Sequence, residues 1–224
     1  SEGLTDEMDE EADGGGEAPG DDVLAASCSG ATSSAGEVIG SVDSLQAVGD
    51  SILGHNKETS QSIPDFVGSE LGVAMVNNAV GGAEMGGPEG IPALYESGTY
   101  SHVLVTGGGN DFARDCTQSV LDGIVSADLQ SGLMVELLDA IAADGAQSVI
   151  VGYYIPQDRE TGCELFPELL RRYRELAQTR SDVMYICTLE TITPDTPDFY
   201  DDPVHPSSDG ARAIGQLIAT QLQP

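Results

Sequence analysis

The sequence predicts an α/β fold of the doubly wound type, in which helices cover both faces of one parallel sheet. Five short runs rich in Val, Ile, Leu and Ala are almost continuously apolar, which is typical of strands buried on both faces. Helical stretches alternate with these runs, as they do in successive βαβ units. With 224 residues, 40% of them hydrophobic, the chain is long enough for one such domain.

The predicted strands are the runs 44–49, 72–77, 102–107, 147–154 and 182–187. The predicted helices span 60–71, 118–143 (as one helix or two), 164–180 and 207–222. In the helix 164–180, apolar residues recur at helical spacing, and we expect Arg171, Arg172 and Arg174 on the opposite, polar face. Because ligands of such sheets bind beyond the carboxyl ends of the strands, a functional site is expected in the loops that follow them.

Residues 1–40 differ in composition from the rest of the chain. They are rich in Asp, Glu, Gly, Ser and Ala and show no apolar periodicity, so they cannot bury enough surface to offset the entropy of ordering. We therefore expect an acidic mobile tail or linker over residues 1–40 and one folded domain over residues 41–224.

The chain is strongly acidic: its 38 acidic residues outnumber 8 basic ones, and the formal net charge is -30. Because contacts to phosphate need Lys and Arg, this balance argues against nucleic acid and anionic membrane surfaces as partners. No run of about 18 uncharged apolar residues occurs, so no transmembrane segment is expected.

Four short segments at the expected ligand end of the sheet carry unusual residues. They read GDS (49–51), NNAVGG (77–82), GGND (108–111) and, in the loop before the last helix, DPVH (202–205). Each alone has a structural explanation, since Ser51 could cap a helix and the glycine-rich segments could be turns. Four such segments in this order rarely coincide by chance. The other two histidines, His55 in the helix expected to start at Ser51 and His102 at the start of a strand, are interpreted as structural.

These four segments resemble the signature blocks of the SGNH (GDSL-type) hydrolases, named for the Ser, Gly, Asn and His of those blocks. Four residues match them in order: Ser51, Gly82 (with Gly81 as the alternative register), Asn110 and His205. Asp202 precedes the histidine by three residues, and the first block reads GDSI instead of GDSL. The resemblance covers residues 44–222 and implies a flavodoxin-like three-layer α/β/α sandwich with a five-stranded parallel sheet.

The resemblance also implies a Ser-His-Asp mechanism. Ser51 would be the nucleophile, His205 its general base and Asp202 the group that orients the imidazole. Three donors would form the oxyanion hole: the Ser51 and Gly82 backbone N–H groups and the Asn110 side-chain amide. Asp50 is expected to cap the following helix and to bond neighbouring loops. This chemistry requires no metal and no cofactor.

The four cysteines show no CxxC spacing that would indicate a zinc or redox site. Cys116 and Cys163 follow the third and fourth predicted strands, so we expect a disulfide between them at the rim of the site. Cys28 and Cys187 are a second predicted pair, with two free thiols as the alternative. Disulfides are typical of exported proteins, and we expect a bacterial-type protein that is secreted, periplasmic or tethered to the surface through its acidic linker.

The predicted function is hydrolysis of carboxylic esters by a monomer. Many glycines and few aromatic residues near the four segments indicate a small or open acyl pocket, which favours short acyl or acetyl esters, with carbohydrate as one candidate for the alcohol. A lysophospholipase and a thioesterase are alternatives within the same family. A catalytically silent, acidic binding module on the same fold is the alternative from another class.

Overall fold

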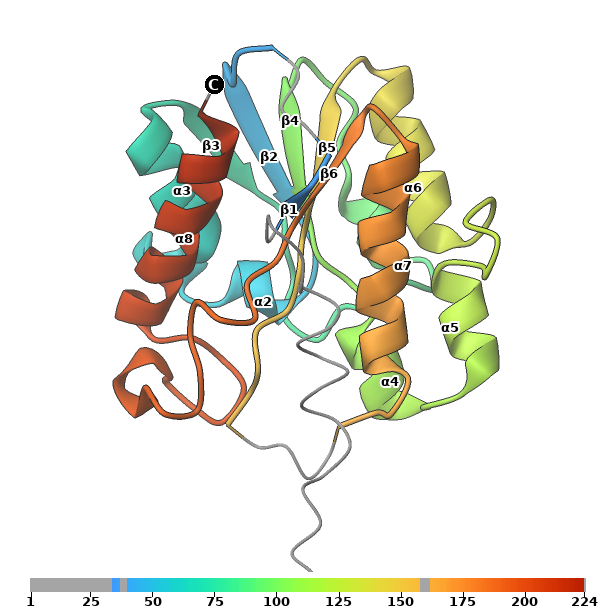
Figure 1. Ribbon diagram of the computed structural model, residues 1–224. Helices are drawn as coiled ribbons and strands as arrows, with labels where there is room; N and C mark the ends of the chain where they lie inside the picture. The colour runs from blue at the N-terminus through green and yellow to red at the C-terminus, as the bar shows by residue number, and fades with distance from the viewer. Residues whose placement is uncertain (1–33, 37–39, 158–161, 224) are drawn as a thin grey trace, which may run out of the picture.

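The computed structural model describes residues 34–36, 40–157 and 162–223 of the chain. The described residues form a three-layer sandwich, with one sheet between two layers of helices (Figure 1). The sheet consists of β1 (Ser34–Ala35), β2 (Ser44–Val48), β3 (Ala74–Asn77), β4 (His102–Val105), β5 (Gln147–Val151) and β6 (Val183–Ile186).

The sheet order is β1-β6-β5-β4-β2-β3, and the five strands from β2 to β6 run parallel. Counted along the chain, these five follow the order 2-1-3-4-5, which is the flavodoxin-like arrangement. The predicted fold class is therefore confirmed, and each of the five parallel strands lies inside its predicted run.

Strand β1 differs from the sequence-based expectation, because it lies within the segment interpreted as a tail. Ser34 and Ala35 pair antiparallel with Ile186 and Tyr185 of β6. A two-residue strand has no periodicity, so the sequence pattern gives no sign of it. Residues 1–33, the bulk of the predicted tail, lie outside the described residues.

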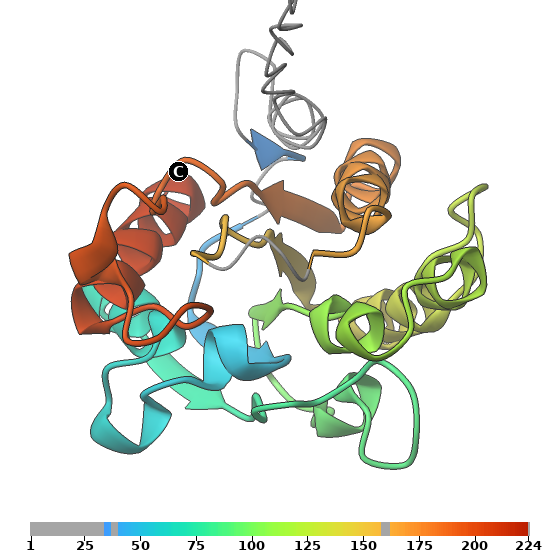
Figure 2. The ribbon, with the colours of Figure 1, turned by 90° about the horizontal axis from the view of Figure 1, so that it is seen from below.

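Two groups of helices cover the two faces of the sheet (Figures 1 and 2). One face carries α3 (Ile63–Leu71) and α8 (Ser208–Leu222); the other carries α4 (Gly109–Arg114), α5 (Gln118–Ile124), α6 (Leu133–Ala143) and α7 (Phe166–Thr179). Shorter elements are α2 (Ser51–Gly54) and the 3₁₀ turns η1 (Lys57–Thr59), η2 (Ile91–Leu94) and η3 (Pro197–Phe199). None of the helices in the described ranges has the length and apolarity needed to span a membrane.

Each face of the sheet has its own apolar core. In β4, Val103 and Val105 pack toward α4–α7, whereas Leu104 between them packs toward α3 and α8, and all three are fully buried. Burial on both sides explains why the strands read as continuous apolar runs rather than alternating ones.

Local signals set the ends of α3. At its start, Ser62 accepts a hydrogen bond from the Asp65 N–H, and the Asp65 carboxylate accepts one from the Ser62 N–H, which is a capping box. At its end, Gly72 adopts φ +68°, a left-handed conformation that glycine reaches without steric cost. The chain therefore returns to the sheet at β3.

The sequence pattern predicted Arg172 on the polar face of α7, and this prediction is wrong. Its side chain is buried, and the guanidinium pairs with Asp122 at 2.6 Å and Glu168 at 2.9 Å. It also donates to the Val125 carbonyl at 2.6 Å, so it joins α7 to the end of α5. The pattern of one helix cannot show this burial, because Asp122 and Val125 belong to α5 and its C-terminal end.

Candidate active site

The GDS segment forms a tight turn between β2 and α2. A Cβ added to Gly49 would lie 2.2 Å from the Thr106 Oγ1 atom, so only glycine lets this turn pass the end of β4. Asp50 is the N-cap of α2 and accepts a hydrogen bond from the Ile52 N–H at 3.0 Å, which confirms its expected capping role. Ser51 is consequently the first residue of α2, at the carboxyl end of the sheet.

The structure brings Ser51, His205 and Asp202 into one hydrogen-bonded chain. The Nε2 atom of His205 lies 2.8 Å from the Ser51 Oγ, and its Nδ1 atom lies 2.8 Å from the Asp202 Oδ2. The three residues come from α2 and from the loop before α8, which lie together at the end of the molecule viewed in Figure 2. The arrangement matches what a serine nucleophile, its base and an orienting carboxylate require.

The turn between Asp202 and His205 holds the Asp202 carboxylate in place. Its Oδ1 atom accepts hydrogen bonds from the N–H groups of Val204 and His205, both at 2.8 Å. Partial burial alone would raise the pKa of Asp202, but its hydrogen bonds from the His205 side chain and from these two N–H groups outweigh that effect and lower the pKa to about 2. Asp202 is therefore a carboxylate at any pH near neutrality.

The loop that carries His205 is anchored to the segment after β5. The Tyr154 hydroxyl donates to the Val204 carbonyl at 2.6 Å, and the Gln157 N–H donates to the Pro203 carbonyl at 2.8 Å. Within the loop, the Asp201 N–H donates to the His205 carbonyl at 3.0 Å. These bonds fix the backbone on both sides of the imidazole.

Gly81 and Gly82 lie beside Ser51. A Cβ added to Gly81 would be 3.9 Å from the Ser51 Cβ, and Gly82 has φ +77°, a left-handed conformation. Within the described part of the chain, the Gly82 N–H has no hydrogen-bond partner. The Asn110 Nδ2 donates to the Ala83 carbonyl at 2.9 Å and carries a second N–H that can donate elsewhere.

Helix α4 fastens the loop that contains these glycines. The Asp111 carboxylate accepts the Met85 N–H, at 2.9 Å and 3.1 Å to its two oxygens, and Arg114 pairs with Glu84 at 3.1 Å. Burial raises the pKa of Asp111. Together with the Asn110 bond, these contacts hold residues 83–85 against α4.

A buried hydrogen-bond network connects the Ser51 turn to the start of α4. The Tyr153 hydroxyl donates to the Asp50 carboxylate and accepts from the Gly109 N–H at 3.1 Å. Thr106 also donates to Asp50, at 3.1 Å. Burial raises the pKa values of both Asp50 and Tyr153. Tyr153 has no role that the sequence predicts, because nothing in the pattern around it indicates one.

His55 is the main difference between the site and its sequence-based interpretation. Its ring stacks on that of His205, with centroids 4.7 Å apart and 14° between the planes. Its Nε2 atom lies 3.1 Å from the Asp201 Oδ2. His55 therefore lies in the site, whereas His102 is buried beside Gln147, in agreement with a structural role. The sequence feature that could have placed His55 in the site is its position four residues after Ser51.

The predicted disulfide between Cys116 and Cys163 is confirmed, with 5.5 Å between the two Cα atoms. It joins the segment after α4 to the segment before α7. Cys28 lies outside the described residues, and its pairing with Cys187 stays a prediction.

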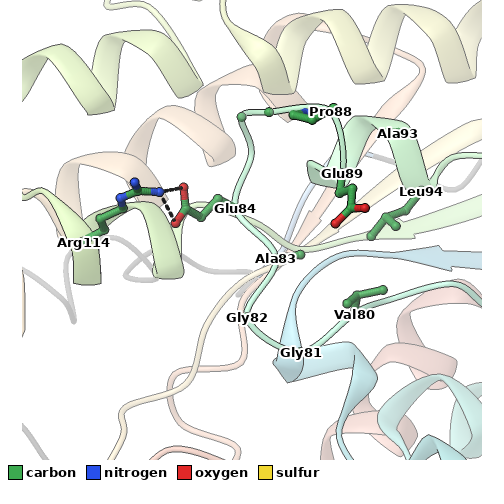
Figure 3. A pocket seen from close by; sticks show the side chains of 12 residues that line it. Val80, Gly81, Gly82, Ala83, Glu84, Pro88, Glu89, Ala93, Leu94 and Arg114 are labelled. Atoms are coloured by element: carbon green, nitrogen blue, oxygen red, sulfur yellow. Dashed lines mark hydrogen bonds and ion pairs between the residues drawn. The ribbon is translucent and has the colours of Figure 1, made fainter.

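A broad pocket of about 600 Å³ lies next to Gly81 and Gly82 (Figure 3). It is lined by residues between Val80 and Leu94 and by Arg114, whose guanidinium pairs with Glu84 on one side of the pocket. The lining is mainly Gly, Ala and Pro, and the Glu89 side chain lies near Leu94 (Figure 3). Across the described ranges, no three His, Cys, Asp or Glu side chains gather as metal ligands would.

Comparison with known proteins shows relatives by structure and none by sequence. No protein-family model and no curated protein matches the chain. A putative SGNH hydrolase from Slackia heliotrinireducens is similar to it with a TM-score of 0.56 at 19% identity, over 81% of this chain and 100% of that one. The psychrotrophic esterase EstA from Pseudoalteromonas sp. is similar with a TM-score of 0.60 at 14% identity, over 80% of this chain and 96% of that one.

A carbohydrate esterase family 2 enzyme from Corynascus thermopiles gives a TM-score of 0.59 at 14% identity, over 80% of this chain and 65% of that one. At these identities the likeness is one of fold. The chain thus has the fold of the SGNH (GDSL-type) hydrolases, which confirms the fold that its four sequence segments imply.

Proposed function

We propose that this chain is a serine esterase that cleaves carboxylic esters through an acyl-enzyme on Ser51. The observation that carries the proposal is the hydrogen-bonded chain from Ser51 through His205 to Asp202, with 2.8 Å at each step. A hydroxyl needs an adjacent base to act as a nucleophile, and the base needs a group that fixes its tautomer. Both are present, on a fold shared with esterases.

In the proposed mechanism, the His205 Nε2 accepts the Ser51 proton as the Oγ atom attacks the ester carbonyl. Asp202 holds the Nδ1–H and stabilises the imidazolium. Collapse of the tetrahedral intermediate expels the alcohol, which takes the proton from Nε2. Water then attacks the acyl-enzyme with His205 again as the base, the bond between the acyl carbon and the Ser51 Oγ breaks, Oγ takes the proton back from Nε2, and the carboxylic acid leaves.

We propose three donors for the oxyanion: the N–H groups of Ser51 and Gly82 and the Asn110 side-chain amide. The unpartnered Gly82 N–H and the second Asn110 N–H support this assignment, since both can donate to a substrate oxygen. Loss of one such donor typically costs about 3 kcal/mol of transition-state stabilisation. Asn110→Ala removes the side-chain donor, together with the Asn110 bond to the Ala83 carbonyl.

The proposed substrates are short-acyl or acetyl esters, with a carbohydrate as one class of alcohol. The pocket beside Gly82 offers only Val80, Leu94 and small residues as apolar surface, and Glu84 and Glu89 add carboxylates. A long acyl chain gains from apolar area that it buries, and carboxylates reduce that gain. The hydroxyl groups of a carbohydrate, in contrast, can donate hydrogen bonds to the carboxylates of Glu84 and Glu89.

We also propose that the protein is exported and acts as a monomer. The Cys116–Cys163 disulfide is of a kind that persists in oxidising compartments, which supports export. The hydrogen bonds among Ser51, His205 and Asp202 are complete without a residue from a second copy, which supports action as a monomer.

Turnover of p-nitrophenyl acetate by the wild type and by Ser51→Ala tests the proposal. We expect hydrolysis that the substitution removes, because the acyl-enzyme cannot form without the Oγ atom. Equal rates for the two proteins would instead favour the silent binding module. A series from acetate to palmitate, with an acetylated polysaccharide beside it, then separates short-acyl hydrolysis from the lysophospholipase alternative, and an acyl thioester tests the thioesterase.

A further inference from the structure

The candidate base lies close to the surface. The side chains of His205 and Asp202 are 25% and 46% exposed. Hydrogen bonds hold the two ring nitrogens, Nδ1 to Asp202 and Nε2 to Ser51, but they do not cover the faces of the ring. A contact on one face would limit rotation of the imidazole away from Ser51 when the bond to Ser51 breaks during the reaction.

His55 makes that contact. Its ring covers one face of the His205 ring, nearly parallel to it and 4.7 Å away. It does so from the end of α2, where the His55 N–H donates to the Ser51 carbonyl at 2.8 Å. The ring that covers the base is thus carried by the same helix as the nucleophile.

Asp201 holds the other end of the His55 side chain. Its Oδ2 atom lies 3.1 Å from the His55 Nε2 and accepts a hydrogen bond from the Asn56 Nδ2 at 3.0 Å. These bonds, the one from Asn56 first, lower the pKa of Asp201. His55 and Asp201 are 146 positions apart in the sequence, so their contact joins α2 to the loop that carries His205.

We propose that His55 is a positioning residue: held by Asp201, it stacks on His205 and keeps the Nε2 atom directed at Ser51. The proposal rests on the serine mechanism given above. Because His55 acts through His205 and does not line the pocket beside Gly82, its loss lowers kcat and leaves KM nearly unchanged.

Three substitutions separate the stacking contact from the hydrogen bond. His55→Phe keeps an aromatic face and loses the bond to Asp201, His55→Gln keeps a polar group and loses the face, and His55→Ala loses both. We expect kcat for p-nitrophenyl acetate to fall about 10- to 100-fold in H55A and H55Q, and by no more than about threefold in H55F. Thermal unfolding of each variant shows whether it is folded, and the comparison of H55F with H55A isolates the contribution of the aromatic face.

The substitution His55→Ala in a His205→Ala background tests whether His55 acts through His205. H55A then has no imidazole left to position, so it should cause no further loss of the residual activity. An undiminished loss in that background would overturn the proposal, as would equal losses of kcat in H55F and H55A.

Labelling of Ser51 by a fluorophosphonate measures activation of the hydroxyl without any ester. We expect its rate to follow the same order, with H55F close to the wild type and H55A and H55Q slower. If Ser51-dependent ester turnover were absent while labelling still followed this order, the proposed function would fail and the role of His55 would stand. Labelling of Ser51 that is absent or insensitive to all three substitutions would overturn the role of His55.

Discussion

Asp202 is the residue whose charge matters most to the proposed base. Hydrogen bonds to both of its oxygens lower its pKa to about 2, so it stays ionised from neutral pH down to about pH 3. Its carboxylate therefore holds the Nδ1–H of His205 throughout that range. Because the pKa in the folded state lies below the ordinary 3.8, ionised Asp202 stabilises the loop above about pH 4 and loses that effect as the pH falls toward 2.

The pH dependence of kcat/KM follows from this. Because Asp202 is already ionised above about pH 4, we expect its carboxylate to add no protonation step to the profile between pH 4 and pH 7. A pH–rate profile with p-nitrophenyl acetate measures the slope. A slope of two protons in that range would contradict this expectation.

Asp202→Asn should keep the shape of the turn and lose the charge. The amide can present its N–H to His205 and so favour the wrong tautomer, and we expect kcat to fall about 10⁴-fold. Asp198→Asn, at an exposed aspartate of η3 in the same loop region, is the matched control and should keep wild-type kcat. Similar kcat values for D202N and the wild type would contradict the role of Asp202.

At the level of single residues, the sequence predicts the candidate reacting groups better than it predicts the residues that hold them in place. Ser51 and Asn110 each follow a strand, and Asp202 and His205 share one turn, so short segments are enough to mark them. The contacts of His55 and of Tyr153 with the site join distant parts of the chain, and no local pattern marks such residues.

At the level of elements, continuous apolar runs identified the five parallel strands because both faces of the sheet are covered. Periodicity does not indicate β1, because this strand has two residues. It also places Arg172 on the wrong face of α7, because one of its polar partners, Asp122, lies on α5. Strand and helix periodicities describe one element at a time. Contacts between elements have to be seen in the structure.

The Cys116–Cys163 disulfide constrains the ends of α4 and α7. It closes a loop across 47 positions, and in the chain-entropy account such a closure stabilises the folded state by about 4 kcal/mol. We expect the double variant Cys116→Ser, Cys163→Ser to lose that order of unfolding free energy in urea denaturation. An unfolding free energy equal to that of the wild type would show that the unfolded chain gains no conformational entropy when the disulfide is removed.

At the level of the whole molecule, the charge of -30 is the dominant physical property. Repulsion among so many carboxylates opposes the compact state, and salt screens it, since the Debye length falls from about 10 Å at 0.1 M to about 3 Å at 1 M. With 8 basic residues, the chain has few ion pairs for salt to weaken.

The melting temperature should therefore rise with NaCl concentration. Each 1 kcal/mol of repulsion removed raises Tm by about 2–4 °C in a domain of this size. Thermal unfolding at 0.1 M and 1 M NaCl measures the change, and p-nitrophenyl acetate turnover before heating shows that the protein starts in its active state. A melting temperature that is constant or falls with salt would contradict this account.

Covalent capture tests whether Ser51 is a nucleophile activated by His205. The protein is treated with a fluorophosphonate, digested and analysed by mass spectrometry. We expect one adduct per chain, on the peptide that contains Ser51, with none in Ser51→Ala and slow formation in His205→Ala. No adduct on the wild type, an adduct on another residue, or labelling at the same rate in H205A would contradict this expectation.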